Sequence, residues 1–284
     1  MRLLLLSLPS LLGCPTGPLS PLAEGDADTD TDSDADCVAE AVERCDGVDN
    51  DCDGVLPDDE VDRDGDGALD CAACDAEGYW QPTLGLSGDA LRQAFNELTF
   101  GHSCTDYGTE REWMFVVLDK DGGVVEGVYT GRTTPVGDTE PDSNDMNTEH
   151  TWPQSLGADV LPARCDLHHL YPVDSGANSR RGNNPYGVVA DAIWEEGGSK
   201  LGDSASGARV FEPRDVHKGN AARSILYFGT RYSYVVEPAY LELLRGWSAQ
   251  DPVDAAELER TRAIRDRQGK ANPYVVCPQR VELL

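Results

Sequence analysis

The distribution of acidic residues along this chain limits where a hydrophobic core can form. Residues 1–78 hold 22 Asp and Glu against 3 Lys and Arg, residues 79–150 hold 13 against 4, and residues 151–284 hold 17 against 16. Most of the formal charge of −29 therefore belongs to the N-terminal part. Because such a segment repels itself and buries little apolar surface, we expect the core within residues 79–284. The nearly neutral C-terminal half leaves nucleic acid open as a partner.

Residues 1–14, MRLLLLSLPSLLGC, predict an export signal, because one positive residue precedes an apolar run too short to cross a bilayer. The end of this run, Leu11 to Cys14, resembles the processing box of bacterial lipoproteins, which implies that Cys14 is lipidated and becomes the mature N-terminus. The alternative is an ordinary cleaved signal peptide with an incidental cysteine. In either case we expect export from a bacterial cell, as a surface lipoprotein, a periplasmic protein or a secreted one. Any contact with a membrane is expected only through this anchor.

Residues 15–36 and 37–78 lack the large apolar side chains that a core requires. The first stretch is rich in Pro, Gly, Ser, Thr and Asp, which predicts a flexible, self-repelling linker. The second is rich in Cys and Asp, so we expect a small irregular module held by disulfides or metal.

A calcium-binding loop is predicted inside this module. Its residues fit the pattern D-x-D-x-D-G-x5-E, in which alternate carboxylates converge on one hard cation and glycine permits a sharp bend. A second loop begins in the same way but has Ala73 where the closing Glu would stand. The predicted ligands of structural Ca²⁺ are Asp49, Asp51, Asp53 and Glu60 in the first loop and Asp62, Asp64 and Asp66 in the second.

Residues 45–71 resemble the Asp- and Cys-rich calcium repeats of thrombospondin type 3. The resemblance implies a structural rather than a catalytic calcium site, and the alternative is a solvated acidic stalk. Apart from Cys14 the chain has an even number of cysteines, which in an exported protein favours disulfides. These cysteines are Cys37, Cys45, Cys52, Cys71, Cys74, Cys104, Cys165 and Cys277.

From residue 79 onward the pattern is typical of a globular α+β domain. Ser87 is a helix cap, and apolar residues recur after it at helical spacing, at Leu91, Ala94, Phe95 and Leu98. Residues 113–118 and 124–129 are apolar, β-rich runs separated by DKDGG, which predicts a hairpin.

The C-terminal third is expected to be mainly helical. Asp251-Pro252 places a capping carboxylate before a proline suited to the first helical turn, and Gly269 ends the run that follows.

Two segments carry groups suited to phosphodiester hydrolysis: NTEHTWPQS at 147–155 and DLHHLYPVDSGANSRRGN at 166–183. The reaction requires a base that deprotonates water and a cation that neutralises charge developing at phosphorus. Histidine suits the first task at neutral pH, so His150 is the candidate base. Oxygen ligands from Glu149 and Asn178 suit Mg²⁺, with Mn²⁺ or Ca²⁺ as alternatives.

These two segments resemble the bacterial endonuclease I family of exported nucleases. That family's motifs run close to N-R-E-H-x-W-P-x-S, D-L-H-x-L-x-P and N-x-x-R-x-N, and the resemblance covers about residues 79–284. It implies a ββα-metal nuclease core with surrounding helices, in which His150 ends a strand as the general base and Asn178 lies on the following helix. It also implies that Glu149 and Asn178 bind the metal, and that cleavage is internal and leaves 5′-phosphate ends.

Arg181 stands where the family motif has its arginine, which implies that it binds the scissile phosphate. The alternative is a salt bridge that secures the short helix. Two positions depart from the family: Thr148 replaces an Arg, and Arg180 stands where an acidic residue is common. Both departures concern phosphate binding rather than reaction type.

His168 and His169 do not indicate zinc, because neighbours on a strand point to opposite faces and no paired ligand spacing supports a closed site. We expect one of them to orient the active site. The tryptophans are interpreted as packing residues.

These observations predict a monomeric, metal-dependent endonuclease that acts on DNA, and on RNA as a second substrate. We expect no sequence preference, because no base-reading motif is present. The alternative is a calcium-dependent surface or adhesion protein whose nuclease-like domain is inactive and only binds nucleic acid.

Overall fold

The computed structural model describes residues 80–83 and 85–284. The predicted signal peptide with Cys14, the linker, and the calcium module with its ligands between Asp49 and Asp66 lie outside the described residues. None of the helices described has the length and apolar character of a membrane span.

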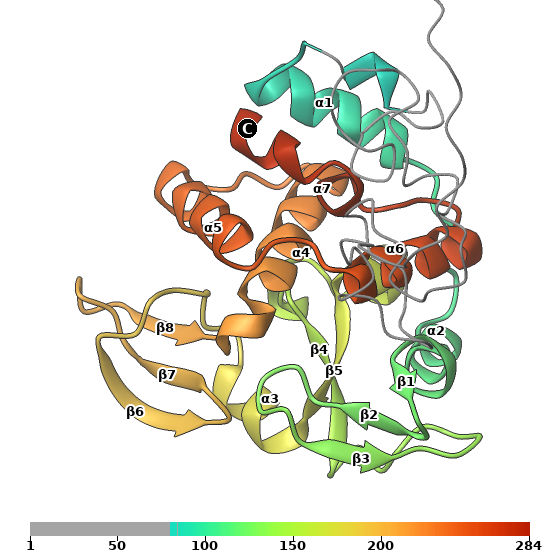
Figure 1. The fold of residues 1–284 in the computed structure, drawn as a ribbon, viewed down its shortest axis with the longest axis vertical. Coiled ribbons are helices and arrows are strands. Elements are labelled where there is room, and N and C mark those ends of the chain that lie inside the picture. The colour runs from blue at the N-terminus through green and yellow to red at the C-terminus, as the bar shows by residue number, and fades with distance from the viewer. Residues whose placement is uncertain (1–79, 84) are drawn as a thin grey trace, which may run out of the picture. The chain divides into compact units, whose positions relative to one another are not determined.

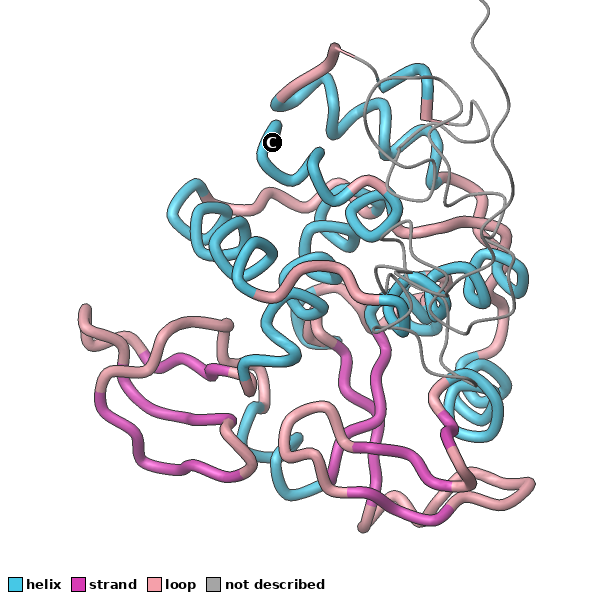
Figure 2. The backbone as a smooth tube through the Cα atoms, in the orientation of Figure 1, coloured by secondary structure: helices cyan, strands magenta, loops and turns pink. Residues whose placement is uncertain are grey.

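The strands of the described residues form three separate antiparallel sheets (Figure 1). Figure 2 shows most of the helices gathered at the opposite end of the domain from the strands. The sheets comprise β1 (Lys120–Asp121), β2 (Val124–Glu126) and β3 (Thr133–Pro135); β4 (Met146–His150) and β5 (Leu170–Asp174); and β6 (Asp191–Glu196), β7 (Ser199–Asp203) and β8 (Arg209–Glu212).

The helices and these sheets together make the α+β class that the sequence predicts. The α-helices are α1 (Gly88–Thr99), α2 (Tyr107–Trp113), α3 (Ser175–Arg181), α4 (Lys218–Arg231), α5 (Pro238–Gln250), α6 (Ala255–Gln268) and α7 (Pro273–Val276). The shorter helical turns are η1 (Gln81–Thr83), η2 (Met114–Leu118), η3 (Gln154–Leu156), η4 (Ala163–Cys165), η5 (Leu167–His169), η6 (Asp215–His217) and η7 (Pro278–Leu283).

Helix α4 is the centre of the larger hydrophobic core. All of its residues except Asn220 are buried, and α1, α5 and α7 pack around it. A second core contains Met114, Phe115, Leu170 and Ile264. The hairpin of β4 and β5 contributes to both cores: Val173 of β5 belongs to the first core, and Met146 of β4 belongs to the second. The β4–β5 hairpin is therefore held rigidly from both sides, as a site built on it requires.

The helix predicted after Ser87 is confirmed as α1, with Ser87 at its N-cap and Leu91 and Phe95 buried. The predicted strand at 113–118 is wrong, because this run ends α2 and continues as the π-helical turn η2. The Asp106 carboxylate caps α2 by accepting a hydrogen bond from the Thr109 amide at 2.7 Å. A short apolar run does not distinguish a strand from a buried helix, and here the cap starts a helix.

A hairpin does follow, but it is shorter than predicted and joins β1 to β2. Its turn is Gly122-Gly123, both with positive φ, at the end of the DKDGG segment.

The helical C-terminal third is confirmed, and Gly269 ends α6 in the left-handed conformation. The predicted cap at Asp251 is wrong: Asp254 caps α6 by accepting from the Glu257 amide at 2.8 Å. Asp251 instead accepts from the Gly219 amide at 2.8 Å, in the first turn of α4.

Candidate active site

Strands β4 and β5 and helix α3 form a ββα unit that carries the predicted site residues. The two strands are antiparallel, with Glu149 opposite Tyr171 and His150 opposite Leu170. The carboxylate of Asp174 then caps α3, because it accepts a hydrogen bond from the Ala177 amide at 2.8 Å. Its second oxygen accepts from the Thr130 hydroxyl at 2.7 Å. The unit matches the expected arrangement: His150 ends β4, and Asn178 lies on the helix that follows β5.

Both ring nitrogens of His150 have a hydrogen-bond partner, one on the backbone and one on a side chain. Its Nε2 lies 3.1 Å from the carbonyl oxygen of Arg164, so this nitrogen carries the proton and donates. Nδ1 is then an acceptor, and the Gln154 amide donates to it at 3.3 Å. Burial and the neighbouring His169 lower the pKa of His150 to about 3. The ring is therefore neutral at neutral pH, and Nδ1 carries a lone pair.

Glu149 is buried beside Arg181, and their exposed side-chain fractions are 1 % and 2 %. Arg181 Nη1 lies 2.9 Å from Glu149 Oε1 as an ion pair, yet within the described residues this oxygen accepts no well-aligned hydrogen bond. Burial raises the pKa of Glu149, whereas Arg181 and the Tyr129 hydroxyl act to lower it. A buried carboxylate oxygen without a hydrogen bond is what a ligand to a cation leaves when the cation is removed.

Asn178, on α3, lies beside β4, the strand that carries Glu149. Its amide nitrogen donates to the carbonyl oxygen of Thr148 at 3.2 Å, which fixes the orientation of the amide. The amide oxygen remains as a ligand atom, so Glu149 and Asn178 fit a loosely held hard cation that keeps most of its waters. In the described part of the chain, no three His, Cys, Asp or Glu side chains gather into a richer metal site.

Arg181 is directed into the protein rather than toward solvent. Nη2 donates to the Thr151 carbonyl at 2.6 Å and Nη1 to the His150 carbonyl at 3.1 Å. Its guanidinium also lies 4.8 Å from the centre of the Tyr186 ring. These contacts match the salt-bridge alternative, and they leave the buried guanidinium no route to a substrate phosphate.

The two positions that depart from the family differ in exposure. Thr148 is buried, and its hydroxyl accepts from Arg111 Nε at 3.0 Å, so α2 brings a guanidinium to the side of β4. Arg180 is exposed on α3, two residues after Asn178.

His168 and His169 are not on a strand, as assumed, but on the turn η5 before β5. His168 Nε2 bonds to the Lys270 carbonyl at 2.8 Å, and His169 Nε2 to the Ala163 carbonyl at 2.7 Å. Only the His169 ring, of these two, contacts that of His150, with centroids 5.3 Å apart. Each histidine keeps a backbone partner, which fits the expectation that they are not zinc ligands.

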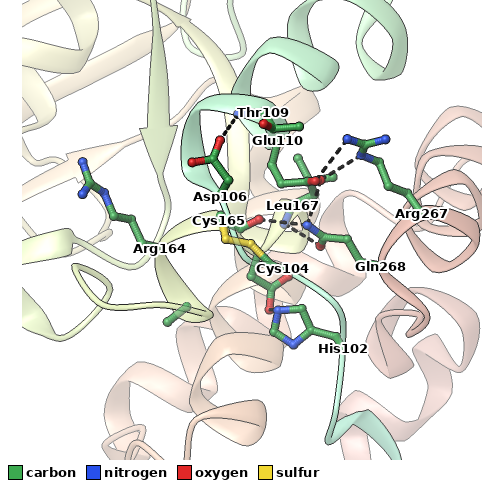
Figure 3. Close-up of a disulfide and its surroundings, with 12 residues drawn as sticks. His102, Cys104, Asp106, Thr109, Glu110, Arg164, Cys165, Leu167, Arg267 and Gln268 are labelled. Atoms are coloured by element: carbon green, nitrogen blue, oxygen red, sulfur yellow. Dashed lines mark hydrogen bonds and ion pairs between the residues drawn. A yellow bond between two sulfur atoms is a disulfide. The ribbon is translucent and has the colours of Figure 1, made fainter.

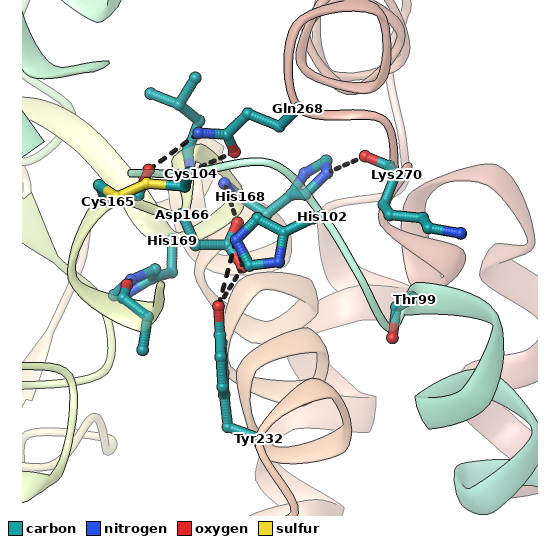
Figure 4. Close-up of polar contacts among 12 residues, drawn as sticks. Thr99, His102, Cys104, Cys165, Asp166, His168, His169, Tyr232, Gln268 and Lys270 are labelled. Atoms are coloured by element: carbon teal, nitrogen blue, oxygen red, sulfur yellow. Dashed lines mark hydrogen bonds and ion pairs between the residues drawn. A yellow bond between two sulfur atoms is a disulfide. The ribbon is translucent and has the colours of Figure 1, made fainter. Parts of the chain in front are cut away.

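Next to this turn lies a buried polar cluster that the sequence did not predict (Figure 4). The Asp166 carboxylate accepts from the hydroxyls of Tyr227 at 2.9 Å and Tyr232 at 2.8 Å, and it faces His102 at 3.5 Å. Burial acts to raise the pKa of Asp166, but His102 and the neighbouring histidines hold it at about 2. Residues 102 and 166 are far apart in sequence, so no local pattern announces their contact.

The disulfide Cys104–Cys165 joins the segment before α2 to η4 (Figure 3). Cys277 is also disulfide-bonded. These bonds agree with the predicted oxidised state of the chain. Because Cys165 directly follows Arg164, the disulfide fixes the backbone whose carbonyl holds His150.

Comparison with known proteins identifies the family to which this fold and site belong. The family described as Endonuclease I matches residues 94–279. An extracellular ribonuclease of Bacillus amyloliquefaciens is 30% identical over 232 residues, which cover 73% of this chain and 78% of that protein. One from Bacillus subtilis (strain 168) is 29% identical over 231 residues, or 72% and 77% of the two chains. A periplasmic deoxyribonuclease of Aeromonas hydrophila is 29% identical over 110 residues, or 39% and 46%.

These matches lie on the segment that contains the ββα unit, with its buried Glu149 and its neutral His150. The chain belongs to the endonuclease I family of nucleases.

Proposed function

We propose that this nuclease hydrolyses DNA and RNA internally and without sequence preference, with His150 as general base and one divalent cation, Mg²⁺, at Glu149 and Asn178. The observation that carries the proposal is the pairing of a neutral histidine, whose acceptor nitrogen faces only the Gln154 side-chain amide, with a buried carboxylate oxygen that accepts no hydrogen bond within the described residues. RNA belongs in the proposal because the relatives that match over most of their length are named ribonucleases.

In the proposed mechanism each residue has one task. The Arg164 carbonyl keeps the proton on His150 Nε2, and Nδ1 takes a proton from the attacking water, which replaces the Gln154 amide at that nitrogen. Breaking the bond from phosphorus to the 3′ oxygen then leaves a 5′-phosphate. A bound cation would supply positive charge to the phosphate and the leaving oxygen. Arg181 holds the Glu149 carboxylate and the backbone after His150 in place.

The remaining predictions concern the N-terminal part of the chain and its location. We propose that the protein is exported, because relatives with extracellular and periplasmic names match it. We retain as proposals the lipid anchor at Cys14, structural Ca²⁺ between Asp49 and Asp66, and a monomeric state. Cys14→Ser tests the anchor, since it should release the protein from membranes.

The proposal is tested with supercoiled plasmid and structured RNA, each incubated with the protein and Mg²⁺ in the presence and absence of EDTA. We expect nicking that EDTA abolishes and that His150→Ala lowers by about 100-fold or more. Nicking that resists EDTA, or that persists unchanged in the variant, refutes the mechanism. Binding without any cleavage supports the inactive-domain alternative instead.

A further inference from the structure

Most arginines of the described residues pair with a carboxylate, as expected in a chain with 52 acidic and 23 basic residues. Arg164 on η4 is an exception, since it is exposed and forms no ion pair with any described residue. Figure 3 shows its side chain extending away from the polar residues around the disulfide. An uncompensated guanidinium in so acidic a protein is suited to an anionic partner.

The position of this guanidinium relative to His150 is fixed by aromatic contacts. It lies 4.8 Å from the centre of the Tyr107 ring, and that ring lies 5.5 Å from the ring of His150. Stacking on Tyr107 orients the guanidinium while leaving its N–H groups to donate elsewhere.

The backbone of Arg164 is equally well fixed. Its amide donates to the Val160 carbonyl at 2.8 Å, its carbonyl accepts from His150, and Cys165 is tied to Cys104. The main chain of this residue thus positions the base, and its side chain projects from the same rigid turn beside the base.

We propose that Arg164 binds the phosphate next to the scissile one in the nucleic-acid strand. The inference rests on the proposed function and extends it, since it names a substrate contact for which Arg181 is unavailable. A polynucleotide presents an anionic phosphate on each side of the bond that is cut, and a planar guanidinium binds such a group through two parallel hydrogen bonds. The contact acts on binding rather than on the reacting bond.

The test is steady-state cleavage of a short fluorescein-labelled DNA duplex between about 50 mM and 200 mM NaCl, by the wild-type protein, Arg164→Ala and Arg164→Lys. We expect Arg164→Ala to raise KM about fivefold with kcat within about twofold, and to reduce the slope of log KM against log salt by about one. Arg164→Lys should keep the slope and raise KM about twofold, because it retains charge without the planar fork.

Arg209→Ala is the matched control. It removes the same charge from an exposed arginine on β8 that pairs with Asp203, and it should change neither KM nor the slope. Melting temperatures of all variants should agree within a few degrees, since the Arg164 side chain carries no hydrogen bond within the described structure.

An active Arg164→Ala enzyme with unchanged KM and slope overturns the inference. A fall in kcat at constant KM overturns it too, because it would assign the side chain to the reacting phosphate or to His150. Failure of the phosphate contact is distinguished from failure of the proposed nuclease function by the Kd of the duplex, measured by fluorescence anisotropy in EDTA. If the wild-type protein binds the duplex in EDTA but does not cut it with Mg²⁺, the proposed function is refuted. The Kd of Arg164→Ala in EDTA still decides the phosphate contact.

Discussion

Two neighbouring groups of histidines in this protein use their polar atoms differently. Around Asp166, the carboxylate is taken up by two tyrosine hydroxyls and faces His102, and His168 is bonded to the Lys270 carbonyl. Around His150, by contrast, one ring nitrogen accepts only from the Gln154 side-chain amide, at 3.3 Å, and Glu149 has an oxygen without a hydrogen bond among the described residues.

Both groups are buried and both contain shifted pKa values, so neither property identifies the catalytic one. Each group also contains buried atoms without a hydrogen-bond partner among the described residues: Glu149 Oε1 in one, and the Nδ1 atoms of His102 and His169 in the other. The difference lies in the kind of atom, because an unpaired carboxylate oxygen is a ligand for a hard cation such as Mg²⁺, whereas an imidazole nitrogen is not a preferred one. The Asp166 carboxylate is engaged by two tyrosine hydroxyls and faces His102, as in a cluster that stabilises a fold, whereas a Glu149 oxygen accepts no hydrogen bond from a described residue and is available to a ligand. We therefore propose that Glu149 and His150 take part in the chemistry, and that Asp166 and its neighbours stabilise the fold.

The largest effect is expected at Glu149. Glu149→Gln should lower kcat by about 100-fold or more, because the amide removes a negative ligand from the cation site. It also leaves Arg181 buried without its partner, which should destabilise the fold by about 3 kcal/mol. Activity assays combined with urea unfolding measure both effects.

The double variant Glu149→Gln, Arg181→Met separates these two effects. It should recover much of the lost stability but none of the activity, since the buried charge is gone while the ligand is still missing. Glu140→Gln, which alters a half-exposed carboxylate paired with Arg111, is the control. Full activity in Glu149→Gln would contradict the assignment of a cation site.

A smaller effect is expected from pH. The supporting cluster contributes to it together with His150 and His217, because burial lowers the pKa of each of these two histidines to about 3. Burial lowers the pKa of His168 and of His169 to about 4, below the ordinary 6.5. The unfolded chain therefore takes up protons as the pH falls below about 6.5, while the folded protein does so only near pH 4. Stability is thus present above that window and is lost as the pH falls through it.

We expect the melting temperature to fall by roughly 10 °C between pH 7 and pH 5. Differential scanning calorimetry over this range measures the effect, and His168→Gln should show a shallower slope. If the melting temperature stays constant between pH 7 and pH 5, the pKa values of His168 and His169 are not lowered in the folded protein.

The sequence predicted the catalytic unit better than its surroundings. Glu149, His150 and Asn178 stand in short motifs, so the sequence could predict that the first two end a strand and that Asn178 lies on the next helix. Asp166 and His102 were missed, because their contact depends on how the segment between α1 and α2 packs against the cap of η5. Arg164 was missed since its importance arises from a backbone carbonyl and a ring contact, and neither has a sequence pattern.

The errors have equally local causes. The apolar run that begins at Trp113 suits a strand by composition, yet the Asp106 cap starts a helix before it. The motif arginine, Arg181, was expected at the phosphate, but sequence does not reveal that α3 directs it beneath β4 to buried carbonyls.

The most direct test of the central claim compares His150→Gln with Asp166→Asn, each assayed for both melting temperature and kcat per folded molecule. We expect His150→Gln to lose about 100-fold or more in kcat with its melting temperature nearly unchanged. Asp166→Asn should melt roughly 10 °C lower and keep kcat within about threefold. The reverse pattern, with catalysis lost at Asp166 and kept at His150, would contradict the division of these histidine groups into a catalytic and a supporting one.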